Sequence, residues 1–169
     1  MSVLKNTGTP NTIKFSETVT SLFNEAKLLS SYRSRTIVGP DGKSAFDQYA
    51  MTQSEFDIFM NSLQYVVVEV FSELAKIANK VSNSVFVDTD ESSTNAEVRF
   101  SLVDYDSYDE NILTIIDKRI RKCYVLYCLT DWWYHSGQDA IAQSYNSQYL
   151  ECLRVMKDKA WVLIKPLMA

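Results

Sequence analysis

The sequence predicts a mainly α-helical protein: a helical bundle with a long C-terminal antiparallel helical hairpin, plus a small β-hairpin or extended arm. Two observations predict the helical hairpin, because apolar residues recur at helical spacing on both sides of Gly137 and a capping sequence at 107–110 precedes them. Alternating apolar and polar residues in 85–103 predict the β-hairpin-like insertion. A chain of 169 residues is expected to form one domain, here a single helical domain over 15–169 behind a polar N-terminal arm, 1–14.

The first predicted helix begins near Ser16 and ends near Tyr32. Its apolar residues recur at three- and four-residue steps: Val19, Leu22, Phe23, Ala26 and Leu29. The sequence Val38-Gly39-Pro40-Asp41-Gly42 then predicts a turn-rich loop, since proline and glycine interrupt helices.

The next helix is predicted from the capping box Thr52-Gln53-Ser54-Glu55 to about Asn79. Its core face contains eight apolar residues: Phe56, Phe59, Leu63, Val67, Val70, Phe71, Leu74 and Ile77. From Val81 the period changes to that of a strand, and 85–103 is interpreted as two strands joined by an acidic tip. A two-stranded hairpin is marginally stable alone, so it must pack on the bundle or pair with another chain.

The C-terminal hairpin is predicted to contain two long helices. The first runs from about Tyr108 to Ser136, roughly 40 Å at the usual rise per residue. Its core stripe is Ile112, Ile116, Ile120, Cys123, Tyr127 and Tyr134. Gly137 ends this helix, and the second begins near Gln138 with its own stripe: Ile141, Tyr145, Tyr149, Cys152, Met156, Ala160 and Leu163. A break this short makes the helices antiparallel, with the two stripes facing each other.

No catalytic, cofactor or metal site is predicted, and we do not expect an enzyme. The one histidine, His135, has no signalled partner for a metal site or a catalytic triad. The acidic tip lacks the glycine of a calcium loop, and Arg99 takes the place of its last ligand. Three cysteines suit neither a disulfide framework nor a zinc site and are expected to be buried thiols: Cys123, Cys128 and Cys152. The sequence predicts no membrane span and no secretion signal, so we expect a cytoplasmic protein without membrane contact.

A basic cluster lies in the first helix of the C-terminal pair: Lys118, Arg119, Arg121 and Lys122. Because successive helical residues turn by about 100°, the four side chains spread over about half of the circumference. Two interpretations remain open, a solvated face that neutralises acidic neighbours or a contact with DNA or an acidic partner. The formal net charge of −4 gives no general attraction to nucleic acid, so DNA contact would depend on this local patch.

Two features predict a partner interface. Residues 123–134 leave hardly any polar face, so this part of the helix is enclosed either inside the monomer or by a neighbouring subunit. On the second helix, Leu150 and Trp161 lie opposite the core stripe with Arg154 close by, and Trp and Arg are enriched in interfaces. The predicted interface therefore has five members: Val125, Trp132, Leu150, Arg154 and Trp161.

The segment from Arg119 to Gly137, which contains Leu129-Thr-Asp-Trp-Trp-Tyr, resembles the small helical neck proteins of tailed bacteriophages. In these head–tail connector or adaptor proteins, an aromatic-rich helix end and a short glycine break lead to a second helix with a basic tail. The resemblance covers about the last third of the chain. It implies a homo-oligomeric ring in the virion neck, assembled in the host cytoplasm, that contacts portal and tail or other neck proteins and encloses passing DNA without sequence specificity. The 85–103 insertion and the acidic balance depart from the pattern, and both portal-proximal and tail-proximal positions stay open.

Two other hypotheses follow from the same residues. A cytoplasmic helical protein-binding or regulatory module would use the predicted interface to hold a soluble partner. A nucleic-acid binder would act through the basic cluster and would bind DNA with strong salt dependence.

Overall fold

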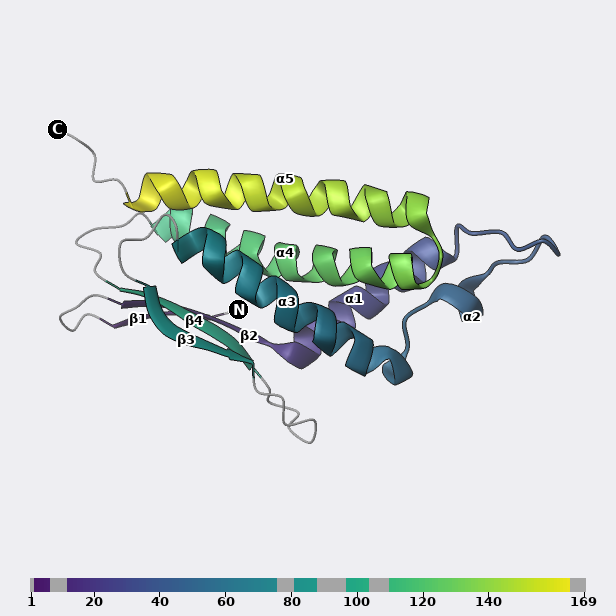
Figure 1. Cartoon of the computed structure of the whole chain (residues 1–169), viewed down its shortest axis with the longest axis horizontal. Coiled ribbons are helices and arrows are strands. Elements are labelled where there is room, and N and C mark those ends of the chain that lie inside the picture. The colour runs from purple at the N-terminus through teal and green to yellow at the C-terminus, as the bar shows by residue number, and fades with distance from the viewer. Residues whose placement is uncertain (1, 7–11, 76–80, 88–96, 104–109, 165–169) are drawn as a thin grey trace.

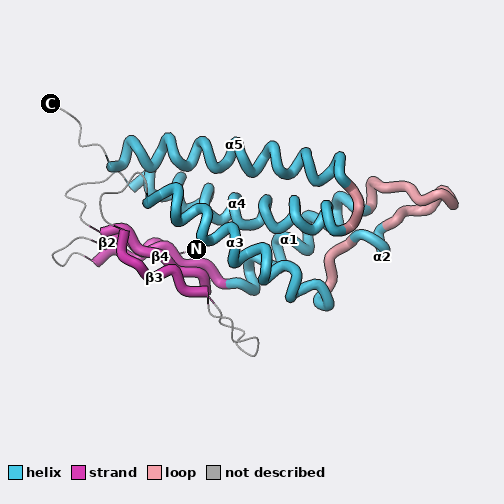
Figure 2. The backbone as a smooth tube through the Cα atoms, viewed as in Figure 1, coloured by secondary structure: helices cyan, strands magenta, loops and turns pink. Residues whose placement is uncertain are grey.

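The computed structural model describes residues 2–6, 12–75, 81–87, 97–103 and 110–164 (Figure 1). The elements follow in the order β1 (Ser2–Asn6), β2 (Thr12–Thr18), α1 (Val19–Ser34), α2 (Phe46–Tyr49), the short 3-10 helix η1 (Gln53–Glu55), α3 (Phe56–Ala75), β3 (Val81–Val87), β4 (Glu97–Val103), α4 (Glu110–His135) and α5 (Asp139–Ile164). The predicted fold class is confirmed. Helices dominate the described residues, and α4 and α5 form a long C-terminal antiparallel hairpin (Figure 2).

A tight turn at Gly137 separates α4 from α5, as predicted. Gly137 has a φ of +70°. Its N–H donates to the Tyr134 carbonyl at 3.0 Å, and the Gln138 N–H donates to the Trp133 carbonyl at 2.9 Å. These two bonds satisfy carbonyl groups that have no partner at the end of a helix, and glycine takes this left-handed conformation without a Cβ penalty.

Helix α4 is the central element, because α1, α3 and α5 all contact it. Figure 1 shows α5 running alongside α4 over most of its length. The apolar half of α4 is buried on nearly every side: Cys123, Tyr124, Val125, Leu126, Cys128, Leu129 and Trp133. Of the two interpretations of this segment, enclosure within the monomer is the one that the structure supports.

The strands form one antiparallel sheet in the order β1-β2-β4-β3. The predicted hairpin corresponds to β3 and β4, with an irregularity in register between Ser82 and Phe86. Strand β2 pairs with β4 on the other side, so that Phe15 lies opposite Phe100. The predicted N-terminal arm, 1–14, therefore contributes β1 and the start of β2 to the sheet, and β2 continues to Thr18, beyond the predicted helix start.

The sheet packs against the helical bundle through buried apolar residues. Phe15 of β2 and Val98 of β4 are part of the same core as Leu74 of α3. Strand β2 runs directly into α1 at Val19, which is also buried. The sheet is thereby joined to the bundle by both backbone continuity and a shared core.

The capping box at Thr52 forms as predicted. Glu55 Oε2 accepts a 2.6 Å hydrogen bond from the Thr52 N–H, and the Thr52 hydroxyl oxygen accepts one from the Ser54 N–H. Helix α3 is described to Ala75, so its predicted end near Asn79 lies outside the described residues. The same is true of 107–109, which hold most of the capping sequence predicted before α4.

Candidate partner interface

Two of the predicted interface residues lie within the chain's own packing. Val125 is only 1% exposed and belongs to the hydrophobic core. The prediction that Val125 contacts a partner was wrong for the folded chain, because the surrounding helices cover this part of α4. Trp132 packs partly buried against the core, and its indole N–H donates a 3.1 Å hydrogen bond to the Tyr49 carbonyl. Its polar atom is thus satisfied inside the chain.

The outer face of α5 is mostly polar. Leu150 is 54% exposed, as expected for an interface residue. Arg154 is exposed too, but its guanidinium pairs with Glu151 at 2.8 Å and with Asp158 at 3.0 Å on the same helix. The side chain of Trp161 lies outside the described residues. A single exposed leucine is common on monomers, so Leu150 alone does not define an interface.

A stronger candidate surface lies on the outer side of α3. Tyr65 and Val68, about one turn apart, are 73% and 57% exposed. Asp57 and Glu69 are exposed on the same helix, and α3 contains neither lysine nor arginine. We call these four residues the acidic-flanked face.

The sequence contained a signal for this face. Residues 65–68 read Tyr-Val-Val-Val, apolar at every position. A helix that is buried on one side cannot hide four consecutive apolar side chains, so some of them must face outward. The spacing of the core stripe alone does not identify which of these four residues face outward.

A second apolar surface follows the outer side of α1 into the loop after it. Leu28, Tyr32 and Val38 are all exposed, and Arg33 and Arg35 are exposed beside them. The Arg35 guanidinium carbon lies 5.8 Å from the Tyr32 ring centroid and 5.3 Å from that of Phe46. Stacking on two rings holds the Arg35 charge next to the apolar residues. We call the set of Leu28, Tyr32, Val38, Arg33 and Arg35 the basic-flanked face.

The two faces point in different directions. Helices α1 and α3 meet through their buried sides, where the rings of Phe23 and Phe56 pack edge to face with centroids 5.0 Å apart. Because the exposed residues of each helix lie away from this contact, one face is directed away from the other. One chain therefore carries two separate apolar surfaces, one with acidic and one with basic neighbours.

No protein-family model, curated protein or solved structure matches this chain. None of the helices in the described ranges combines the length and apolar character that crossing a membrane requires.

Among the described residues, no three His, Cys, Asp or Glu side chains gather in a way that suits a metal ion. His135 is exposed, and its Nδ1 lies 2.9 Å from the Asp131 carbonyl oxygen.

The predicted basic cluster does not act as one surface. Arg121 is held by two carboxylates of the N-terminal region, Glu17 at 2.7 Å and Glu25 at 2.6 Å. Its acidic partners thus belong to the same chain, which removes Arg121 from the predicted DNA contacts. Lys118 and Lys122 are exposed on α4, whereas Arg119 is partly buried.

A buried carboxyl group lies close to this ion-pair network. Asp117 is 8% exposed, and its Oδ1 has no hydrogen-bond partner among the described residues. Burial, together with the nearby Glu17 charge, raises the pKa of Asp117 to about 6. The Asp117 carboxyl therefore titrates well above the range of an exposed aspartate.

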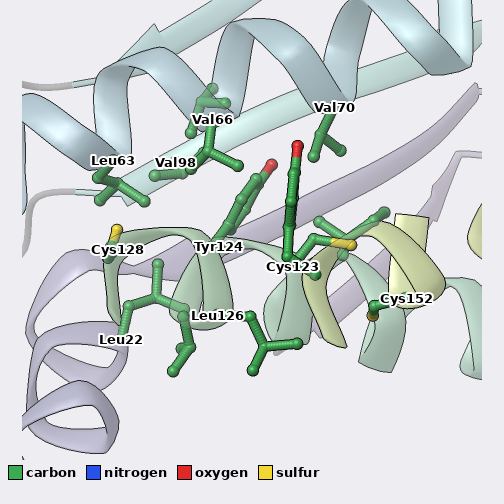
Figure 3. Close-up of a cluster of buried hydrophobic side chains, with 14 of the residues drawn as sticks. Leu22, Leu63, Val66, Val70, Val98, Cys123, Tyr124, Leu126, Cys128 and Cys152 are labelled. Carbon is green, nitrogen blue, oxygen red and sulfur yellow. The ribbon is translucent and has the colours of Figure 1, made fainter. Parts of the chain in front are cut away.

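The three cysteines are free and buried, as predicted (Figure 3). Cys128 stands apart, with its sulfur 3.9 Å from the Phe59 carbonyl oxygen. Cys123 of α4 and Cys152 of α5 lie close enough for each to shift the pKa of the other, and the Cys152 thiol donates a 3.4 Å hydrogen bond to the Arg119 carbonyl oxygen. The fold thus brings two of the three thiols together across the α4–α5 contact.

Proposed function

We propose that this chain is a structural protein of a tailed-phage virion, a head–tail connector subunit that forms a ring between portal and tail around the DNA channel. The resemblance of 119–137 to phage neck proteins supports the phage context. One observation carries the assembly role: a single chain has two exposed apolar faces, one flanked by acidic and one by basic residues.

Two different faces of this kind favour a heterologous contact, in which the acidic-flanked face of one copy meets the basic-flanked face of the next. Heterologous contacts build rings when the rotation between copies closes, whereas a self-complementary patch would give a twofold dimer. Burial of the apolar residues would supply most of the affinity. The opposite charges would favour this pairing and oppose contact between two identical faces.

Other surfaces remain for the neighbouring neck proteins and for DNA. Leu150, on the outer face of α5, is exposed and lies on a different helix from the two faces. Leu150, Arg154 and Trp161 would contact portal or tail proteins in this proposal. Lys118 and Lys122 would be the basic residues that face passing DNA, through charge and without base contacts.

Paired face variants test the assembly role. One variant carries Tyr65→Ser and Val68→Ser, and the other carries Leu28→Ser and Tyr32→Ser. Each variant alone should stay monomeric in native mass spectrometry at concentrations where the wild type assembles, alone or on purified portal. A mixture of the two should give dimers only, because each variant keeps one intact face. In the absence of portal, Leu150→Ser should assemble like the wild type, because Leu150 lies outside both faces. Rings formed by either face variant alone would contradict the proposal.

Imaging of assembled particles tests the phage context separately. Density for the chain in a ring between portal and tail is the expected result. Absence of the protein from purified virions would contradict the connector role. Recovery of one soluble partner from native cells, with no portal or tail protein, would support the alternative of a cytoplasmic protein-binding module.

A further inference from the structure

The packing of the C-terminal hairpin places two thiols opposite each other. Tyr127 of α4 and Tyr149 of α5 pack edge to face with ring centroids 5.3 Å apart. Cys123 and Cys152 lie one turn farther from Gly137 on the same two helices, and the Cys152 sulfur lies 3.4 Å from the carbonyl oxygen of Arg119, one turn before Cys123. Both side chains belong to the buried cluster in Figure 3. Because α4 and α5 are packed antiparallel here, the two sulfurs are held together by the hairpin itself.

The two thiols differ in their surroundings. The interaction with the Cys123 thiol and the nearby positive charges of Arg119 and Lys122 lower the pKa of Cys152 to about 7 against the opposing effect of burial. The same contact and burial raise the pKa of Cys123, which therefore keeps its proton. Cys152 is therefore the thiol of this pair that ionises first.

We propose that Cys123 and Cys152 form a reversible intramolecular disulfide when the protein meets a hydroperoxide. The Cys152 thiolate attacks one peroxide oxygen, so that an S–O bond forms, the O–O bond breaks and hydroxide leaves. Cys123 sulfur then attacks the Cys152 sulfenic acid, forming the S–S bond and releasing water with the Cys123 proton. The two thiols supply the two electrons that reduce the peroxide. A thiol reductant reverses the reaction by exchange.

The disulfide would join α4 to α5 across the middle of the hairpin. Both thiols are buried, so a small oxidant has to reach them during local opening of the hairpin. A crosslink that closes a loop of this size constrains the unfolded chain, and the oxidised protein should melt roughly 5–15 °C above the reduced protein.

The test uses the full-length reduced protein and hydrogen peroxide. After oxidation, free thiols are blocked with N-ethylmaleimide, and peptides are analysed by mass spectrometry without reduction. The expected product is a peptide pair linked through Cys123 and Cys152, with Cys128 alone alkylated. The linked pair should disappear on reduction, and the melting temperature should return to that of the reduced protein.

Single variants make the result specific. Cys128→Ser, the matched control, should form the linked pair as fast as the wild type. Cys123→Ser and Cys152→Ser should form no intramolecular link, and Cys123→Ala and Cys152→Ala serve if a serine variant fails to fold. In the wild type, the rate of crosslinking should rise as pH increases through about 7. Retention of all three alkylatable thiols after prolonged oxidation, or a link that involves Cys128, would overturn the proposal.

Discussion

The hydroxyl of Tyr149 donates a 2.6 Å hydrogen bond to Glu69 Oε2 and so joins α5 to α3 across the side of the bundle. Tyr149 is buried, and burial together with the Glu69 carboxylate raises the pKa of its phenol. The hydroxyl therefore stays protonated and remains a donor throughout the ordinary pH range. Lys157 and Glu73 form an ion pair between the same two helices.

Tyr149→Phe should lower the free energy of unfolding by about 1.5–3 kcal/mol, because it removes a hydrogen bond to a charged group. Urea denaturation followed by circular dichroism measures the change. Tyr145→Phe is the matched control, since Tyr145 is partly buried one turn away and its hydroxyl makes no hydrogen bond among the described residues. A double-mutant cycle with Glu69→Gln should return a coupling of similar size. Equal effects of both tyrosine variants would contradict this role for the Tyr149 hydroxyl.

Arg121→Met should destabilise the protein by about 3–5 kcal/mol, because it removes the guanidinium that pairs with the buried Glu17 carboxylate. Lys118→Met removes the same charge three residues earlier from an exposed position, and it should change stability by less than about 0.5 kcal/mol. Adding Glu17→Gln to Arg121→Met should recover part of the loss. Thermal and urea unfolding of the wild type, the two single variants and the double variant measure these changes. A loss of stability in Arg121→Met no larger than that in Lys118→Met would refute the structural role of Arg121.

Stability should fall as pH rises from about 4 to about 6, on account of Asp117. Its carboxyl has a pKa near 6 in the folded chain instead of 3.8, so the folded state binds more protons than the unfolded state in this window. The shift corresponds to about 3 kcal/mol at most above pH 6. Asp117→Asn should remove this contribution to the slope and should be more stable than the wild type at pH 7. Parallel stability–pH curves for the two proteins would count against the raised pKa.

Thr52→Ala should cost about 1 kcal/mol, because it removes the hydroxyl that caps the N-terminus of the η1–α3 segment. Thr52→Ser keeps a hydroxyl at the same position and should lose much less. The comparison needs only equilibrium unfolding of three proteins. Identical losses for the alanine and serine variants would indicate that the methyl group of Thr52, not its hydroxyl, is responsible.

Features that depend on neighbouring residues were predictable from the sequence. The break at Gly137, the capping box at Thr52 and most of the facing stripes of α4 and α5 arise from positions within a few turns of one another. Tyr134 is the exception in the α4 stripe: it was predicted to be a core residue and is 44% exposed. The four-stranded sheet was predicted only in part. Residues 12–16 alternate apolar and polar side chains in the manner of a strand, but their partner is β4, far along the chain, and nothing local signals that pairing.

The candidate interface was harder to predict for a related reason. The pattern around Val125 indicates enclosure, yet only the packing of the other helices reveals that the enclosing surface belongs to the same chain. Arg121 likewise finds Glu17 and Glu25 from a distant part of the sequence. The outward positions of Tyr65 and Val68 depend on which side of α3 meets α4, which the apolar run alone does not specify.

The strand order has a consequence for synthesis on the ribosome. Thr12 pairs with Val103, so β2 emerges long before the strand that will lie beside it. Until β4 has been translated, the N–H and C=O groups on one edge of β2 have no hydrogen-bond partner in the nascent chain. Such an edge can pair with a strand from another molecule. The α4–α5 hairpin has no such delay, because its two helices follow each other directly and are joined by one short turn. Fragments that end before residue 97 should therefore aggregate more readily than fragments that retain β4.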